Sequence, residues 1–315
     1  MKDTTDMNGA ESLVRTLLAC DVNVCFTNPG TSEMHFVAAL DHVPGMRCVL
    51  ALHETVATGA ADGYYRMSRK PACTLLHLGP GLANGLSNLH NAKKAGSGVV
   101  NIVGEHAPTH VELDAPLTSD IEGIARPVSH WVHTSHDVGE LGTDAARAVQ
   151  ASVSAPGQIA TLKLPSETAW TEGGLVAGAL PAPDLAPFAQ EVLDEATRAL
   201  GGPDSLLLLG GQALTEENLL TAGRIAAQTG CVLLSEWSNA RMERGAGRVS
   251  VGRVPYPIDQ ALDVLKPFKR IVLVGARAPI GFFAYPGKPA VLTAEGAEIT
   301  KQAGADAALN GALDA

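Results

Sequence analysis

The chain has 315 residues, 46% of them hydrophobic, and a formal net charge of −10. This length suits about two domains with buried cores. The acidic balance argues against nucleic acid as a partner, because phosphate backbones attract basic surfaces. No apolar stretch is long enough to span a bilayer, and no basic amphipathic helix indicates binding to a membrane. The polar first six residues are unlike a secretory signal, so we expect a cytoplasmic protein.

The first half of the chain alternates between helical and extended patterns. Helices are predicted at residues 9–19, 33–40, 54–68, 82–94 and 138–152, and strands at 22–27, 48–52, 72–76, 98–103 and 158–164. Residues 108–136 are expected to be irregular. This alternation predicts an α/β domain built on a doubly wound parallel sheet, with helices on both faces.

A linker and a second, smaller domain are expected after it. Residues 172–187 contain three prolines and two adjacent glycines, which predicts a linker between domains at 1–171 and 188–315. Helices are then predicted at 188–200 and 216–228, and strands at 205–209, 231–234, 269–274 and 290–292. We expect a second doubly wound, Rossmann-like sheet. The Gly210-Gly211 turn lies outside any Gly-x-Gly-x-x-Gly motif, so it favours a plain strand–helix turn over an NAD site.

The cysteines and histidines do not indicate a metal site. The five cysteines are scattered without a Cys-x-x-Cys pair, so we expect reduced core thiols: Cys20, Cys25, Cys48, Cys73 and Cys231. Pro108 keeps His106 and His110 from sharing one regular helix face. His130, His133 and His136 are expected in a solvated loop. We therefore predict no metal bound by this chain itself.

Polar side chains follow three of the predicted strands. Thr31 comes after the first strand, His77 ends the strand at 72–76, and Glu105 follows the strand at 98–103. Ligands of open α/β sheets bind beyond the carboxyl ends of the strands, so Thr31 is a site candidate. Thr31 is also expected to cap the next helix, a role compatible with ligand binding.

Glu54 stands at the start of a helix whose first turns are small and apolar. Val56, Ala57, Gly59 and Ala60 follow it, and such residues let backbone or a flat ligand come close. Two interpretations stay open. The carboxylate stabilises the positive end of the helix, or it exchanges protons with a ligand.

Four short motifs occur in order: Asn28-Pro29-Gly30-Thr31, His53-Glu54, Ala61-Asp62-Gly63-Tyr64 and His77-Leu78-Gly79-Pro80-Gly81. Together they resemble the pyrimidine-binding N-terminal domain of thiamine-diphosphate-dependent 2-oxo-acid enzymes. The most similar branch contains acetolactate synthase and benzoylformate decarboxylase. The resemblance implies that the second domain is the central domain of this family, which carries FAD or another nucleotide in some relatives.

The resemblance also implies roles for individual residues. Glu54 would be the glutamate that binds the aminopyrimidine ring and favours its imino form. His77 would be catalytic and transfer protons, although a strand-end histidine can be merely hydrogen-bonded. The substrate contacts would be Thr31, His77 and Glu105, the last standing where relatives often have glutamine. The cofactor contacts would be Asn28, Pro29, Gly30, Glu54, Gly79, Pro80, Gly81 and Asn84.

A further domain is implied by the family and not by this sequence. Relatives bind the diphosphate and magnesium through a third domain with a Gly-Asp-Gly motif, which does not occur here. We expect an acetolactate synthase-like lyase or transferase acting on a 2-oxo acid, with a benzoylformate-type decarboxylase as the alternative. The chain would then be a fragment, or a subunit whose partner carries that domain, or a noncatalytic assembly module. A homodimer or homotetramer is expected, because relatives build the site between subunits.

Overall fold

The computed structural model of the protein describes residues 7–185, 189–307 and 309–314. The chain forms two compact units, Met1–Pro183 and Asp184–Ala315, each described by itself below. The last two residues of the predicted linker, and the first residue of the helix predicted at 188–200, lie outside the described residues.

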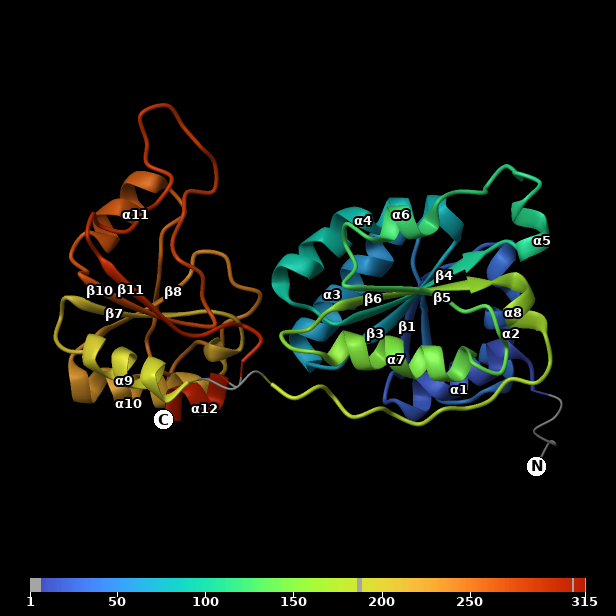
Figure 1. Ribbon diagram of the computed structural model, residues 1–315, viewed down its shortest axis with the longest axis horizontal. Coiled ribbons are helices and arrows are strands. Elements are labelled where there is room, and N and C mark those ends of the chain that lie inside the picture. The colour runs from blue at the N-terminus through green and yellow to red at the C-terminus, as the bar shows by residue number, and fades with distance from the viewer. Residues whose placement is uncertain (1–6, 186–188, 308, 315) are drawn as a thin grey trace. The chain divides into compact units, whose positions relative to one another are not determined.

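The first domain is built on a parallel sheet of six strands in the order β2-β1-β3-β4-β6-β5 (Figure 1). The strands are β1 (Val24–Asn28), β2 (Arg47–Leu50), β3 (Ala72–Leu76), β4 (Val99–Glu105), β5 (Trp131–Thr134) and β6 (Ile159–Pro165). The chain passes from β1 outward to β2, and β3 then pairs with the other side of β1. The strand order therefore reverses between β1 and β3, which is where ligands of open α/β sheets bind.

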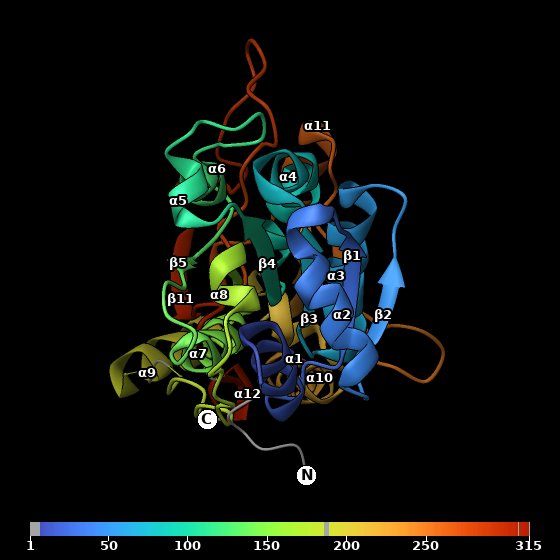
Figure 2. The same cartoon turned by 90° about the vertical axis from the view of Figure 1, so that its right-hand side faces the viewer.

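Helices cover both faces of this sheet, as the two views in Figures 1 and 2 show. One core packs beneath α1 (Gly9–Ala19), α2 (Met34–His42), α7 (Leu141–Val153) and α8 (Ser166–Trp170). The other packs beneath α3 (Glu54–Ser68), α4 (Leu78–Ala95) and α6 (Ile121–Ala125). Two short segments complete the domain, the 3-10 turn η2 (Thr31–Glu33) and α5 (Pro108–Val111). The predicted α/β class is thus confirmed.

Most element boundaries lie within a few residues of their prediction, and two regions differ. Helix α4 begins at Leu78, four residues before the predicted start, because Gly79-Pro80-Gly81 forms its first turn. Proline is tolerated there, since its missing N–H would have no helical partner. Residues 108–136 are not irregular throughout. They contain α5, α6 and the edge strand β5, which are too short to show a clear periodicity.

The second domain holds five parallel strands in the order β11-β10-β7-β8-β9. The strands are β7 (Ser205–Leu209), β8 (Val232–Ser235), β9 (Gly252–Arg253), β10 (Arg270–Val274) and β11 (Glu298–Ala303). The helices are α9 (Gln190–Ala199), α10 (Glu216–Thr229), α11 (Ile258–Leu265) and α12 (Leu309–Asp314), and η3 (Gly211–Leu214) is a 3-10 turn. The strand predicted at 290–292 is wrong, because Val291 makes only an isolated bridge to Ile280. The last strand is β11, an edge strand. Half of its residues are exposed, so its sequence shows no continuous apolar run.

The helix that begins with Glu54 packs closely on α4. Asn88 donates to the Thr55 carbonyl at 2.8 Å, and the Thr58 hydroxyl donates to the Gly85 carbonyl at 3.1 Å. A Cβ added at Gly59 would lie 2.7 Å from the Asn88 amide nitrogen, whereas a Cβ at Gly63 would meet nothing within 4 Å. The lack of a side chain at Gly59 therefore allows α3 and α4 to pack closely, whereas a side chain at Gly63 would have room.

These two glycines of one helix provide a matched pair. Gly63→Ala is expected to raise the free energy of unfolding by about 0.4–1 kcal/mol, because alanine restricts the unfolded chain and fits the open space. Gly59→Ala has the same backbone effect but displaces Asn88, so it should be the less stable of the two. Urea unfolding of both variants measures the difference. Equal stabilities would show that the Asn88 contact is not maintained.

Three of the five free cysteines lie side by side across the sheet. Cys25 of β1 pairs in register with Cys48 of β2 and Cys73 of β3. Cys48 is exposed, so the expectation of a core thiol is wrong for that residue. The reason is its place on the edge strand, whose outer side has no neighbouring strand. Its hydrogen bond with Cys25, together with the loss of water around the sulfur atom, raises the pKa of the Cys48 thiol.

A raised pKa leaves less thiolate at a given pH, and the thiolate is the form that reacts. Alkylation of Cys48 by iodoacetamide at pH 8 is therefore expected to be at least about tenfold slower than that of a peptide cysteine, a tenfold change per pKa unit. Mass spectrometry of timed digests measures this rate, with the urea-unfolded chain as the control. A peptide-like rate in the folded chain would contradict the hydrogen bond to Cys25.

Candidate functional site

Polar side chains gather at the carboxyl edge of the first sheet, where the strand order reverses. Asn28 ends β1 and is in register with Leu76, the last residue of β3. His77 follows directly as the N-cap of α4, and Glu105 ends β4. The parallel pairing of β1 with β3, and of β3 with β4, brings these strand ends to one edge of the sheet.

Glu54 is the first residue of α3 and is 7% exposed. Its Oε2 accepts a hydrogen bond from the Asn84 side chain at 3.0 Å and lies 4.0 Å from His53 Nε2. A Cβ added at Gly81 would lie 3.2 Å from Oε1, so only the lack of a side chain there leaves room beside this oxygen. The structure thus brings together three residues predicted separately, Glu54, Gly81 and Asn84. Among the described residues, only Oε2 of this carboxylate has a hydrogen-bond partner.

The loop before Glu54 is fixed from two sides. The Asn28 side chain donates to the Ala51 carbonyl at 2.8 Å. The N-cap of the helix is His53, whose Nδ1 accepts from the Thr55 backbone N–H at 3.2 Å. Glu54 therefore occupies the first turn of α3, so the helix-stabilising interpretation applies, and it does not exclude contact with a ligand.

His77 is partnered by a carboxylate that sequence reasoning missed. The Glu33 side chain is buried, and its Oε2 lies 2.9 Å from His77 Nδ1. The same oxygen accepts the Gly30 backbone N–H at 2.8 Å. The only local signal is a glutamate at the third residue after an N-cap, the spacing of a capping box. This spacing predicts the Gly30 contact but gives no hint of His77.

The backbone next to His77 is strained. Leu78 has φ +51°, a left-handed conformation that is uncommon for a residue with a branched side chain, and it is fully buried. Such residues persist only where the surrounding structure holds them, and they cluster at functional sites. The strain therefore marks the β3–α4 turn as a place where the position of His77 is fixed by its surroundings.

The remaining predicted residues lie around this edge with different roles. The expectation that Thr31 caps the next helix is wrong, because the N-cap of α2 is Glu33 and Thr31 lies in η2, whose N-cap is Gly30. Thr31 itself is exposed, as is Pro80, whereas Pro29 is partly buried. A Cβ at Gly79 would clash with the Ser119 hydroxyl, so this glycine serves packing.

Glu105 is buried and engaged by structural partners. Its Oε1 accepts the His106 backbone N–H at 2.8 Å, and its Oε2 lies 3.6 Å from Lys163 Nζ. These contacts give it a charge partner on the neighbouring strand β6. Within the described part of the chain, no hydrogen bond joins it to Glu54 or His77.

The histidine clusters have local partners of their own. The rings of His106 and His110 pack edge to face at 5.2 Å, and His133 Nε2 lies 3.1 Å from an Asp144 oxygen. His130 Nδ1 accepts the Ile159 backbone N–H at 3.0 Å. Over residues 7–185, 189–307 and 309–314, no group of three histidine, cysteine or acidic residues is arranged to hold a metal ion.

In the same ranges, helices with the length and apolarity needed to cross a bilayer are absent.

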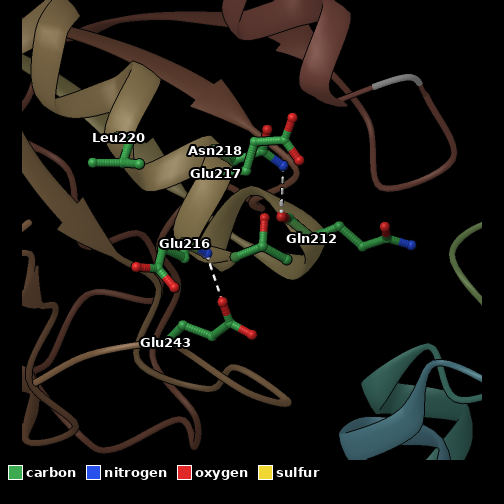
Figure 3. Close-up of a pocket in the computed structure, with 7 residues that line it drawn as sticks. Gln212, Glu216, Glu217, Asn218, Leu220 and Glu243 are labelled. Carbon is green, nitrogen blue, oxygen red and sulfur yellow. Dashed lines mark hydrogen bonds between the residues drawn. The ribbon is translucent and has the colours of Figure 1, made fainter. Parts of the chain in front are cut away.

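A pocket of about 550 Å³ in the second domain does not fit a flavin's phosphates. It is lined by Gln212, Thr215, Glu216, Glu217, Asn218, Leu220 and Glu243 (Figure 3). The Glu243 carboxylate accepts the Glu216 backbone N–H at 2.7 Å, and so takes the helix N-terminus that a phosphate would bind. Two of the carboxylates around the pocket, Glu216 and Glu243, are paired with Arg248. FAD therefore gains no support from this pocket.

The surroundings of Glu54 include an exposed apolar rim. Leu50 is 72% exposed, Leu52 97% and Val56 56%, and all three lie within four residues of Glu54. Single exposed apolar residues are ordinary, whereas contiguous exposed apolar surface often marks an interaction site.

Comparison with known proteins agrees with this arrangement. Residues 7–132 match the family described as "Thiamine pyrophosphate enzyme, N-terminal TPP binding domain". The chain is 48% identical, over 93% of its length, to the Mycobacterium tuberculosis protein named "Putative acetolactate synthase large subunit IlvX", of which it spans 56%. Over 44% of its length it is 29% identical to a benzoylformate decarboxylase of Pseudomonas aeruginosa, covering 26% of that protein.

Solved structures show the same fold. A thiamine diphosphate-dependent 4-hydroxybenzoylformate decarboxylase of Rhodococcus jostii RHA1 superposes with a TM-score of 0.80 at 18% identity, over 98% of this chain and 61% of that one. The matching domain, the relatives and the fold agree with one another. The first domain therefore belongs to the family of N-terminal TPP-binding domains of thiamine pyrophosphate enzymes, and the chain is similar to relatives named acetolactate synthase and benzoylformate decarboxylase.

Proposed function

We propose that this chain supplies the pyrimidine-binding half of a thiamine-diphosphate site that decarboxylates a 2-oxo acid, with acetolactate synthase-like carboligation as the outcome. The observation that carries the proposal is the Glu54 carboxylate. One of its oxygens is held by Asn84, and the other lies beside Gly81. A carboxylate held at one oxygen can bind a ring nitrogen with the other.

The residues present fit the cofactor's ring. Gly81 adds no Cβ beside the Glu54 Oε1, so a flat heteroaromatic ring can approach that oxygen. When bound, thiamine diphosphate supplies the carbon nucleophile and the electron sink for decarboxylation. Glu54 would hold a proton at the aminopyrimidine nitrogen, and Asn84 would fix the direction in which Glu54 points. His77 would accept or donate a proton near the reacting carbon.

Assembly with a partner is part of the proposal. The chain spans 56% of the relative to which it is 48% identical. The groups that bind the diphosphate and magnesium would lie outside these 315 residues, in the same protein or in a partner. The apolar rim of Leu50, Leu52 and Val56 would be covered by a second protomer, or by a chain that carries those groups.

Calorimetry with thiamine diphosphate and magnesium tests this assignment. We expect binding when the chain is mixed with a chain that carries a diphosphate-binding domain, and weaker binding by the chain alone. The same titration with Glu54→Gln should lose affinity. If no combination binds, the chain is instead a noncatalytic assembly module.

A benzoylformate-type decarboxylase is the second candidate function. It is favoured by His77, which is held by a buried carboxylate at the position where that branch of the family has its active-site histidine. The products distinguish the two activities. Pyruvate converted to acetolactate supports the first, and benzoylformate converted to benzaldehyde supports the second.

A further inference from the structure

The Glu33 carboxylate, at the carboxyl edge of the first sheet, is buried but only partly hydrogen-bonded. It is 1% exposed. Its Oε2 has two partners, the Gly30 N–H at 2.8 Å and His77 Nδ1 at 2.9 Å. Its Oε1 is buried and has no hydrogen-bond partner among the described residues. Burying a carboxylate oxygen without a hydrogen bond costs free energy. We therefore look for a role of Glu33 beyond capping η2.

Two glycines make room for this carboxylate and its histidine. A Cβ added at Gly30 would lie 2.2 Å from His77 Nδ1, and one at Gly104 would lie 1.7 Å from Glu33 Oε1. Gly30 has φ −121°, a conformation open to any residue, so its constraint is the contact and not the backbone angle. The segments that follow β1 and β3, and the strand β4, are thus shaped around the Glu33–His77 pair.

The hydrogen-bond pattern limits where the histidine proton can be. An ionised carboxylate only accepts, and Oε2 already accepts from Gly30. His77 Nδ1 must then be a donor, so in the neutral ring Nε2 is the acceptor. The opposite tautomer requires a protonated Glu33 that donates to Nδ1. The two arrangements place the histidine proton on different nitrogens, so they can be told apart by experiment.

We propose that Glu33 is a positioning residue that keeps the His77 proton on Nδ1, so that Nε2 accepts and returns a proton of the substrate. The inference rests on the proposed function only for the identity of that substrate, a 2-oxo acid. When Nε2 takes up the proton, the ring becomes a cation and the Glu33 carboxylate pairs with it. When Nε2 releases the proton, the neutral Nδ1–H tautomer is restored.

Nitrogen-15 NMR of the histidine side chains in the full chain tests the tautomer without cofactor or turnover. His77→Gln identifies the His77 signals by their loss. We expect the neutral ring of His77 to carry its proton on Nδ1 in the wild-type chain. A proton on Nε2 in the wild-type chain would overturn the proposal, whatever the variants do.

Two substitutions separate the acceptor from the charge. Glu33→Met keeps the size but removes the acceptor, so the preference for Nδ1–H should disappear. Glu33→Gln keeps an acceptor oxygen without the negative charge, so the tautomer should persist. In the assembled enzyme, Glu33→Gln should lower kcat by about 10²-fold or more, with little change in KM, since the charge matters only when the ring is a cation.

The controls separate this inference from the proposed function. Glu112→Met removes an exposed carboxylate and should change neither the tautomer nor kcat. An unchanged tautomer in a folded Glu33→Met chain would overturn the positioning role. If His77→Gln turns over like wild type, proton transfer at His77 Nε2 is overturned, although the proposed function stands. If the tautomer responds as expected but the assembled wild-type protein turns over no 2-oxo acid, the proposed function fails, while the control of the tautomer by Glu33 stands.

Discussion

Glu54→Gln is expected to slow deuterium exchange at C2 of bound thiamine diphosphate by about 10²–10⁴-fold in the assembled enzyme, the usual range for a positioned proton-transfer group. Glutamine can occupy the same space, and its side-chain oxygen can still accept from Asn84. It cannot hold a proton at the pyrimidine nitrogen as a carboxylate does. The change therefore isolates the chemistry from the packing.

Proton NMR after rapid acid quenching measures this exchange. Glu112→Gln is the matched control, because Glu112 is exposed and its removal should leave the rate unchanged. Asn84→Ala should have a smaller effect than Glu54→Gln, because it frees the carboxylate without removing it. An exchange rate in Glu54→Gln equal to wild type would remove Glu54 from the mechanism.

Phe36→Ala is expected to lower the free energy of unfolding of the first domain by about 3–5 kcal/mol, the cost of emptying a large buried aromatic site. Phe36 is fully buried in the core beneath α1, α2 and α7. It lies three residues after Glu33, so its loss should also loosen η2 and the contact with His77. Met34→Ala in the same helix is the control, since Met34 is 58% exposed and should change stability by less than about 0.5 kcal/mol.

Two domains in one chain complicate a single unfolding curve. Tryptophan fluorescence in a Trp237→Phe background reports on the first domain alone, because the other two tryptophans, Trp131 and Trp170, lie there. We expect the midpoint in urea to fall for Phe36→Ala and to stay in place for Met34→Ala. Equal midpoints would show that α2 does not depend on this side chain.

Local chemistry explains which elements could be predicted. The helix at 54–68 and the strand at 72–76 have the predicted bounds, because strong apolar patterns and flanking turn residues mark both ends. The strand β11 was missed and 290–292 was predicted in its place, because an edge strand exposes much of its surface and so shows no apolar run. The start of α4 was placed late, because a glycine–proline turn can lie before a helix or within its first turn.

The residues of the candidate site also differ in whether the sequence alone could point to them. The order of the four motifs pointed to Glu54, His77 and the glycine turn as site candidates, because each motif is contiguous in the chain. Glu33 was missed as a partner of His77, which lies 44 residues away in sequence. Nothing near Glu33 signals that contact, since its spacing from Gly30 matches an ordinary helix cap.

The sequence by itself determined the α/β class, the helix that begins with Glu54, and the family to which its motifs belong. Those properties follow from residues within one turn or one strand of each other, where periodicity and capping act. Only the tertiary structure decided that β1 lies between β2 and β3. That order brings the loop after β1 against the turn after β3, so the Glu33 carboxylate meets the His77 ring. Strand order depends on packing between distant segments, and for that reason no local pattern records it.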